Sequence, residues 1–274
     1  MMIDIPPPFD TTWLLAYLRA RQASAVERIG DDRITRAIRV EGRPAVLDLA
    51  FHPSHVIATC SVAMPTADLR ALVTRMLDLD ADVAAFARQV QRDRVLGRLV
   101  RARPGLRVLQ FLDPFECVMR AVLGQQVSVR AATTLFNRVV VASRADVEAG
   151  VRAGPTAAEL ASFGPEQLQR LGIMPARAVA LHKIAVAIAE GRVDFEALRA
   201  APGGDAQAAL VALPGIGPWT ASYIRMRALG DRDAFPAADL GVLKALKTTA
   251  VEAERRSKRW SPWRAYATMY LWAG

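Results

Sequence analysis

The sequence predicts an α+β protein in which an N-terminal antiparallel-sheet domain is followed by two all-α lobes. Three observations predict this class. Alternating apolar and polar stretches are confined to the first part of the chain, helical spacing dominates from about Asp82 onward, and Pro- and Gly-containing breaks separate the helices. Hydrophobic residues make up 52% of the chain and charged residues 23%, so there are enough apolar side chains to bury a core.

The first part of the chain combines helices with short strands. A helix is predicted from Thr12 to about Ala25, with Asp10 or Thr11 as its N-cap. The segment Thr66–Asp68 is predicted to begin a second helix, because apolar residues recur after it with helical spacing. Between the helices lie two strands whose apolar residues share a face, Leu47, Leu49 and Phe51 in one and Val56, Ala58, Cys60 and Val62 in the other.

From Asp82 onward we predict no strand, and helices follow one another to the end of the chain. Thr156 and Glu159 form a capping-box pattern that predicts the start of one of them. We therefore expect an α+β domain at 1–88, a connecting helix and linker that packs with the C-terminal lobe at 89–112, a helical lobe ending in a helical hairpin at 113–230, and a C-terminal helical lobe at 231–274. A cleft is expected between the two lobes.

Composition and cysteine content exclude several classes of protein. No stretch of about 20 apolar residues lacks a charge, so no membrane span is expected. The N-terminal MMIDIPPPFD lacks the basic and apolar segments of a signal peptide, which predicts a cytoplasmic protein. Cys60 and Cys117 are too few for a disulfide framework or an iron–sulfur cluster. His52 and His55 flank a proline in HPSH, which favours a surface loop over a zinc site.

The charge balance is basic, with 36 Lys and Arg against 27 Asp and Glu and a net charge of +9. Such a balance favours a polyanionic partner, because neutralising phosphates releases counterions and drives association. The balance alone does not decide the partner. Arg- and Ala-rich chains are also typical of high-GC genomes, and a basic soluble enzyme without a nucleic-acid partner stays an alternative.

The most informative segment is LPGIGPWTA at 213–221, a tight turn between two predicted helices. A dinucleotide-binding loop would need a preceding strand and a third glycine, whereas a helix precedes this turn and Thr220 occupies that position. A helix-hairpin-helix fits better. Gly215 and Gly217 allow close approach of the backbone, and free amides at the start of the second helix can bind a phosphate. An ordinary turn between packed helices is the plainer alternative.

Together these segments resemble the 3-methyladenine DNA glycosylase II family of the HhH-GPD superfamily. The resemblance rests on LPGIGPWTASYIRMRAL, DAFPAADLGVLKAL and WSPWRAYATMYLW, and extends upstream to PPPFDTTWLLAYLRAR. It implies a first domain like half of a TATA-binding protein. It also implies a monomeric, nucleoid-associated, monofunctional enzyme that flips alkylated bases of the 3-methyladenine and 7-methylguanine type out of duplex DNA and hydrolyses their N-glycosidic bond, initiating base excision repair.

By this resemblance, Asp239 in PAADLGVLK is the catalytic carboxylate. Its place at the start of a predicted helix is also that of an ordinary N-cap, and the two roles are compatible. A carboxylate at a helix N-terminus is held ionised and fixed, so it can stabilise the oxocarbenium character of the sugar and orient the attacking water. Ala238 stands where some members have a second acid, so catalysis is expected to rest on Asp239 alone.

Trp219, Tyr223 and Trp272 match aromatic positions of the family's base pocket, although core packing would also place Trp219 and Tyr223 on one helix face. An electron-rich pocket suits N3- or N7-alkylated purines, because these cations gain about 0.5–2 kcal/mol of cation–π energy over a neutral base. Trp219 also stands where bifunctional relatives carry the lysine that forms a Schiff base, which indicates an enzyme without a lyase step.

The resemblance also implies how DNA and a cation are held. Gln126, in LGQQVS, is expected to fill the gap left by the flipped base, where some members carry leucine. Hairpin amides are expected to bind DNA phosphates at Gly215, Gly217 and Thr220. Backbone carbonyls are expected to bind a monovalent cation, Na⁺ or K⁺, at Val211, Leu213 and Ile216, and no other cofactor is required. A basic run is either a solvated helix face or an extension of the phosphate contacts: Arg255, Arg256, Lys258, Arg259 and Arg264.

Two alternatives from other functional classes stay open. One is an HhH glycosylase for deaminated or oxidised bases, and the other is a non-catalytic DNA-binding module that uses the hairpin for affinity. Asp239 and its aromatic neighbours argue against a pure binder, and Trp219 argues against the lyase versions. Alkylated purines, alkylated pyrimidines and hypoxanthine all remain candidate substrates.

Overall fold

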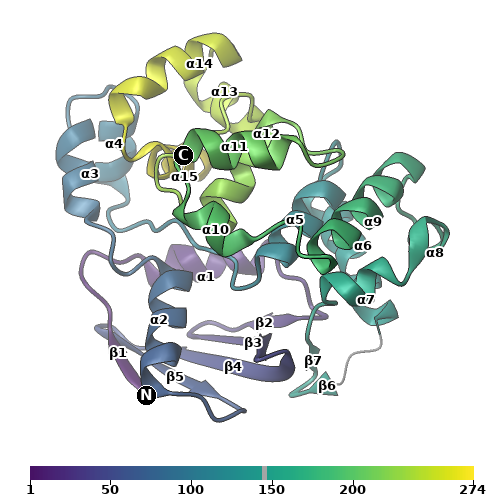
Figure 1. Cartoon of the computed structure of the whole chain (residues 1–274). Coiled ribbons are helices and arrows are strands. Elements are labelled where there is room, and N and C mark those ends of the chain that lie inside the picture. The colour runs from purple at the N-terminus through teal and green to yellow at the C-terminus, as the bar shows by residue number, and fades with distance from the viewer. Residues whose placement is uncertain (144–146) are drawn as a thin grey trace.

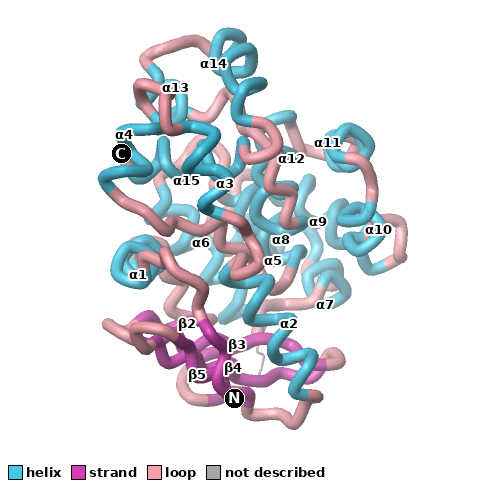
Figure 2. The backbone as a smooth tube through the Cα atoms, turned by 90° about the vertical axis from the view of Figure 1, so that its left-hand side faces the viewer, coloured by secondary structure: helices cyan, strands magenta, loops and turns pink. Residues whose placement is uncertain are grey.

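A computed structural model describes residues 1–143 and 147–274, and it confirms the α+β class (Figure 1). The strands gather at one end of the molecule and the helices stack over them, as the turned view shows (Figure 2). Among the residues described, no helix is both long and apolar enough to cross a bilayer.

The N-terminal domain is built on a five-stranded antiparallel sheet with the strand order β1-β5-β4-β3-β2. Leu47 pairs with Cys60 and Leu49 with Ala58, so the two predicted apolar faces lie side by side. Leu47, Leu49 and Ala58 are fully buried, which confirms the alternation. The strands are β1 (Met2–Asp4), β2 (Glu27–Ile29), β3 (Arg33–Val40), β4 (Arg43–Phe51) and β5 (His55–Cys60).

Two helices complete this domain, and one of them is shorter than predicted. Asp10 caps α1 (Thr11–Arg19) by accepting the Trp13 N–H at 2.9 Å, as expected. The helix ends at Arg19 rather than near Ala25, because the chain must turn to enter β2, and the Glu27 carboxylate accepts the Ala23 N–H inside that turn. The second helix, α2 (Thr66–Leu77), begins where it was predicted.

The prediction that no strand follows Asp82 was wrong. A two-stranded hairpin is formed by β6 (Val147–Glu148) and β7 (Val151–Arg152), and Val151 packs against Ala37 and Val46 on the outer face of the sheet. Its tight turn places Ala149 at φ 49° and Gly150 at φ 72°. The strands are two residues long, too short to show an alternating pattern. Val62 also lies outside its predicted strand, because β5 ends at Cys60.

The remaining elements are helical, and Thr156 and Glu159 form the expected capping box ahead of one of them. The second helix of the predicted helical hairpin, α12, runs directly into a π-helical turn, η1. The elements are α3 (Val83–Val90), α4 (Leu96–Ala102), α5 (Pro114–Leu123), α6 (Val129–Ala142), α7 (Ala157–Ala161), α8 (Gly164–Arg170), α9 (Pro175–Ala189), α10 (Phe195–Ala200), α11 (Gly203–Val211), α12 (Pro218–Ile224), η1 (Arg225–Leu229), α13 (Leu240–Leu246), α14 (Ala250–Ser257), the 3₁₀ turn η2 (Lys258–Trp260) and α15 (Arg264–Ala273).

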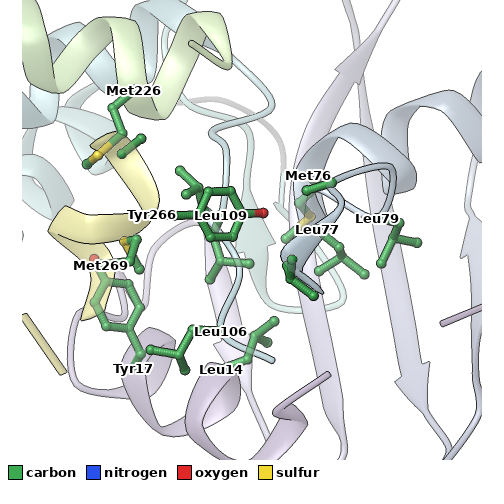
Figure 3. Packing of buried hydrophobic residues seen from close by; sticks show 14 of the residues in the cluster. Leu14, Tyr17, Met76, Leu77, Leu79, Leu106, Leu109, Met226, Tyr266 and Met269 are labelled. Carbon is green, nitrogen blue, oxygen red and sulfur yellow. The ribbon is translucent and has the colours of Figure 1, made fainter. Parts of the chain in front are cut away.

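The described residues form two large hydrophobic cores. The first joins the sheet, α1–α4 and the C-terminal helices, and Figure 3 shows side chains from α1, α2 and α15 meeting in it. The second lies among α5, α6, α9, α11 and α12. Tyr223 packs against both cores, so α12 stands at the boundary between them. The four-part division of the chain stays a prediction.

A buried ion network fixes the sheet against the second core. Arg36 on β3 pairs with Glu27 on β2 and with Glu116 on α5, and Arg120 contacts both carboxylates. Burial raises the pKa of Glu116, but Arg36 and Arg120 outweigh it and lower that pKa overall. Removing one partner from such a network typically costs about 3–5 kcal/mol. The network therefore holds the N-terminal domain and α5 in one arrangement.

Candidate active site

The hairpin turn between α11 and α12 uses its two glycines differently. Gly215 has φ 75°, and a Cβ there would lie 2.9 Å from the Ala180 Cβ, so any other residue would be strained at this position. Gly217 has φ −87°, and a Cβ there would meet no atom within 4 Å. A turn packed only against its own helices explains Gly215 but gives no reason for Gly217.

The loop before α6 lies against this hairpin. Gln125 Nε2 donates to the Gly215 carbonyl at 2.8 Å and to the Thr220 hydroxyl at 3.3 Å. The next residue, Gln126, is exposed and has φ 56°. Thr220 is 3% exposed, so its side chain is buried and cannot contact DNA. Only its backbone amide remains a candidate for binding a phosphate. The predicted wedge and the predicted phosphate site thus lie on adjoining loops.

Asp239 is the N-cap of α13, as the structural interpretation predicted. Its Oδ1 accepts the Val242 N–H at 3.0 Å and the Trp272 indole N–H at 2.7 Å. Its Oδ2 accepts the Trp219 indole N–H at 3.1 Å. Two aromatic side chains from different helices therefore orient one carboxylate, which an ordinary N-cap does not need.

The three predicted pocket aromatics lie together around this carboxylate. The rings of Trp219 and Tyr223 stack with their centroids 5.6 Å apart, and those of Tyr223 and Trp272 are 6.4 Å apart. All three, with Asp239, line a cavity of about 810 Å³. Burial raises the pKa of Tyr223 to about 12, so its hydroxyl keeps its proton at neutral pH. The cavity is large enough for a nucleobase with its sugar.

Comparison with known proteins identifies the family to which the sequence belongs. Residues 1–113 match the model of the AlkA N-terminal domain, and residues 119–261 match the model of the HhH-GPD superfamily base excision DNA repair protein. The chain belongs to the HhH-GPD superfamily. Within it, the chain is 35% identical to "DNA-3-methyladenine glycosylase 2" of Escherichia coli, over 97% of this chain and 94% of that protein.

Two further relatives extend the match. The chain is 35% identical to the "Probable bifunctional transcriptional activator/DNA repair enzyme AlkA" of Mycobacterium tuberculosis, over 99% of this chain. It spans only 56% of the length of that relative. Among solved structures, the 3-methyladenine DNA-glycosylase from Archaeoglobus fulgidus superposes with a TM-score of 0.85 at 22% identity, covering 100% of this chain and 97% of that one. This likeness shows the HhH-GPD fold with its sheet domain.

In this HhH-GPD protein, the N-terminal domain supplies a wall of the cavity that the sequence did not reveal. Tyr17, from α1, lines the cavity, and its hydroxyl accepts a hydrogen bond from Arg227 Nη1 at 2.8 Å. The ring of Trp13 stacks on that of Tyr17 with the centroids 4.8 Å apart, and the Arg21 guanidinium lies 3.9 Å from the Tyr17 ring centroid. Both ring faces are therefore covered, and the hydroxyl edge carries its polar contact.

Arg227 also lines the cavity, next to the aromatic side chains. Its guanidinium is buried, lies 5.9 Å from the Tyr223 ring centroid and donates to the Leu109 carbonyl at 2.6 Å. Helical periodicity predicts only that such an arginine follows Tyr223 by one turn. Its partner Tyr17 lies 210 positions away, so no local signal could have joined them.

Gly241 is a second position that sequence reasoning missed. A Cβ there would lie 3.0 Å from Trp272 Cδ1 and 3.1 Å from Asp239 Oδ1. The absence of a side chain thus lets the indole approach the carboxylate. The glycine two residues after the acid in PAADLGVLK was the available signal.

The C-terminal basic run is largely paired within the protein. Arg255 pairs with Glu252 and Arg264 with Asp233, while Arg256 and Arg259 both lie near Asp93. These contacts favour the solvated-face interpretation of the run. The lysines that line the cavity are instead on and just after α13, at Lys244 and Lys247.

The predicted cation ligands are backbone carbonyls at the hairpin. Val211 ends α11, and the Leu213 carbonyl accepts the Ile216 N–H at 3.1 Å across the turn. A carbonyl oxygen has two lone pairs, so this bond leaves room for a cation. Within the described ranges, no group of three or more His, Cys, Asp or Glu side chains is placed to hold a metal.

Proposed function

We propose that the chain is a monofunctional DNA glycosylase that removes alkylated bases from duplex DNA and so initiates base excision repair. The observation that carries the proposal is the Asp239 carboxylate, held by two indoles on the wall of an aromatic cavity beside the hairpin. The name of the E. coli relative, DNA-3-methyladenine glycosylase 2, supports the same substrate class.

Asp239 supplies the charge that the reaction needs. A carboxylate has about four lone-pair positions, and three of them accept the N–H groups of Trp219, Val242 and Trp272. The remaining position faces the reacting sugar or its water. Water adds to the sugar carbon, the N-glycosidic bond breaks with its electron pair moving to the base, and the proton of the water passes to solvent. The fixed carboxylate stabilises the oxocarbenium character of this step.

The aromatic wall selects the base after it has left the duplex. A base inside the cavity must be flipped, because the cavity is lined by side chains of α1, α5, α12, α13 and α15 and lies too deep for a base that stays in the duplex. Gln126 is the proposed side chain that occupies the vacated position, where it can hydrogen-bond the orphan base. Gly215, Gly217 and the Thr220 amide are the proposed phosphate contacts, and the Val211, Leu213 and Ile216 carbonyls would hold a monovalent cation that adds positive charge there.

The decisive experiment is single-turnover base release from methylated duplex DNA. Asp239→Asn keeps an N-cap side chain and is expected to slow release of 3-methyladenine and 7-methylguanine at least about 100-fold, with nearly unchanged DNA binding. Asp194→Asn is the matched control, because Asp194 is also an N-cap, that of α10, and does not line the cavity. No base release by the wild type, or full activity of Asp239→Asn, contradicts the proposal.

Absence of a lyase step is tested on the same protein. Borohydride is expected to trap no enzyme on DNA, and the product should be an intact abasic strand until alkali is added. Lys244 and Lys247 are the cavity amines to replace if a band appears. A trapped band that disappears with Lys244→Met overturns the monofunctional assignment. Substrates containing hypoxanthine or 8-oxoguanine, run in parallel, distinguish the alternative of a glycosylase for deaminated or oxidised bases.

A further inference from the structure

We propose a second ligand site, for a phosphate monoester, in a cavity that is separate from the one described above. This cavity has a volume of about 490 Å³, which is within the range of small-molecule sites. Four arginines from three segments line it: Arg75, Arg199, Arg225 and Arg232. Guanidinium groups present planar forks of N–H donors that match phosphate oxygens.

The cavity lies away from the hairpin, at the other end of the α12–η1 segment. Pro218 begins that segment beside the hairpin turn, whereas Arg225, Leu229 and Gly230 line the second cavity at its far end. At a rise of about 1.5 Å per residue, the 12 residues from 218 to 229 span roughly 17 Å. A duplex phosphate at the hairpin amides therefore does not fill this cavity. Gln110 lines both cavities and forms the partition between them.

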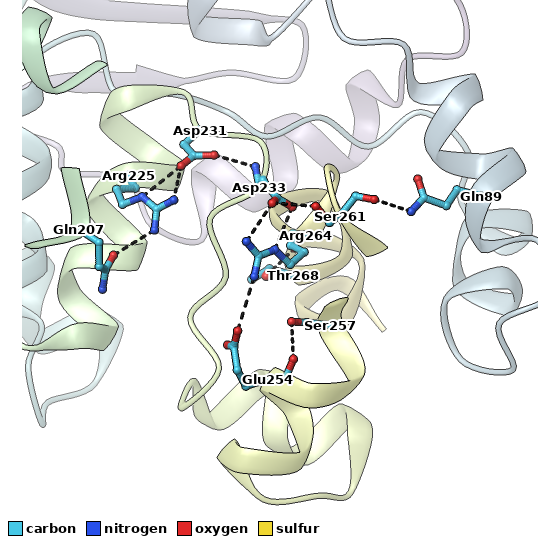
Figure 4. A network of polar contacts seen from close by, with 10 residues as sticks. All are labelled: Gln89, Gln207, Arg225, Asp231, Asp233, Glu254, Ser257, Ser261, Arg264 and Thr268. Carbon is cyan, nitrogen blue, oxygen red and sulfur yellow. Dashed lines mark hydrogen bonds and ion pairs between the residues drawn. The ribbon is translucent and has the colours of Figure 1, made fainter. Parts of the chain in front are cut away.

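Three of the four arginines are paired with carboxylates and one is not. Arg225 pairs with Asp231, as Figure 4 shows, Arg232 with Asp78, and Arg199 with Glu196. Arg75, on α2, is half-buried and has no hydrogen bond or ion pair from its side chain to any residue in 1–143 or 147–274. Burial and the nearby Arg199 lower the pKa of Arg75, and they outweigh the Glu196 carboxylate, which raises it. Glu196 is paired with Arg199, so Arg75 has no carboxylate of its own and leaves room for an anion.

The free end of Arg75 points to the kind of ligand. Arg75 Nε and Gln110 Oε1 lack a hydrogen-bond partner among the described residues, but both atoms are covered by protein and do not face the cavity. The two terminal nitrogens of the Arg75 guanidinium are not covered in this way, and they too have no hydrogen bond to a described residue. Such a pair of N–H donors fits two oxygens of a phosphate monoester. This group occurs in a free sugar phosphate and at the phosphorylated 5′ end of a DNA strand.

One side of the cavity is closely packed. A Cβ on Gly203 would clash with Arg225 Nη2 and lie 3.1 Å from Asp231 Oδ2, so the α11 backbone packs directly on this ion pair. A Cβ on Gly230 would lie 2.8 Å from Gln110 Oε1. Arg225 also donates to Gln207 at 3.2 Å, which fixes its guanidinium in place (Figure 4). These contacts hold the paired arginines rigid and leave Arg75 to meet the ligand.

The test is calorimetric titration of the wild-type chain with ribose 5-phosphate, without duplex DNA. Binding is expected, and Arg75→Gln is expected to weaken it at least tenfold while leaving base release unchanged. Arg88→Gln is the matched control, because Arg88 is an exposed arginine whose removal changes the net charge equally. If Arg75→Gln does not fold, Arg75→Lys keeps the charge, loses the planar fork and should still weaken binding. No binding by the wild type, or equal loss in Arg88→Gln, overturns the proposal.

A second arm identifies the source of the phosphate. A 5′-phosphorylated hexanucleotide is compared with its unphosphorylated form and with ribose 5-phosphate on the wild type and Arg75→Gln. Arg75-dependent preference for the phosphorylated strand assigns the site to DNA ends, and preference for ribose 5-phosphate assigns it to a free sugar phosphate. Equal binding of both strands, unaffected by Arg75→Gln, contradicts a monoester site. Base release is measured separately, so this result and the glycosylase test fail independently.

Discussion

Replacing Gly217 with alanine separates the DNA contact of the hairpin from its role in folding. The backbone at Gly217, with φ −87° and ψ 174°, is extended and suits alanine, and the added methyl group meets no protein atom within 4 Å. A glycine to alanine change at a compatible backbone alters stability by only about 0.4–1 kcal/mol. Folding should therefore be nearly unaffected, and any loss of function must come from a molecule outside the chain.

The expected loss follows from the phosphate contact that the methyl group obstructs. A hydrogen bond to a charged group contributes about 1.5–3 kcal/mol, so losing one contact should weaken duplex binding about 10- to 150-fold. Gly215→Ala should behave differently. Its φ of 75° costs a non-glycine residue about 1–2 kcal/mol, and the new Cβ would approach Ala180, so stability should fall as well.

The assay is fluorescence anisotropy with undamaged duplex, together with urea unfolding of each variant. Gly204→Ala is the matched control, because a Cβ there also meets no atom within 4 Å. The backbone amide of Gly217 is uncharged and does not release a counterion from the DNA. The plot of log binding constant against log salt concentration should therefore have the same slope for Gly217→Ala and the wild type. Wild-type duplex binding by Gly217→Ala, or a loss of stability as large as that of Gly215→Ala, would refute this reasoning.

Two other predictions concern residues that support the cavity. Tyr17→Phe removes the hydroxyl that accepts from Arg227 and should slow single-turnover base release about tenfold, the scale of a hydrogen bond to a charged group, without changing binding of undamaged duplex. Burial raises the pKa of Asp113 to about 6, so the folded state loses stability as pH rises from about 4 through 6. Asp113→Asn keeps the N-cap and should remove that dependence, making the variant more stable than the wild type at pH 7.5 by up to about 3 kcal/mol in urea unfolding, but not at pH 4.

Local patterns predicted the elements, and tertiary requirements set their ends. Alternation identified β4 and β5, and the Asp10 and Thr156 caps were placed correctly, because each depends on residues within a few positions. The end of α1 depends on β2 pairing with β3, which local spacing does not encode. The β6–β7 hairpin is held by a tight turn and by packing on the sheet, so its short strands carry no periodic signal.

The candidate site was likewise predictable only where its residues are close in sequence or belong to a known motif. The sequence placed Asp239 and Trp219 within 20 positions of each other, and the resemblance added Trp272, so the carboxylate and its indoles could be expected together. The sheet domain's share could not, because Tyr17 meets Arg227, and Arg36 meets Glu116, across the domain boundary. Through those contacts the N-terminal domain contributes to the cavity and is held against the helical part of the protein. The sheet is held against α5 by the Arg36–Glu116 ion pair, and helix α1 of the same domain places the Tyr17 hydroxyl at the cavity. Changes in this domain should therefore affect base release before they affect binding to undamaged DNA.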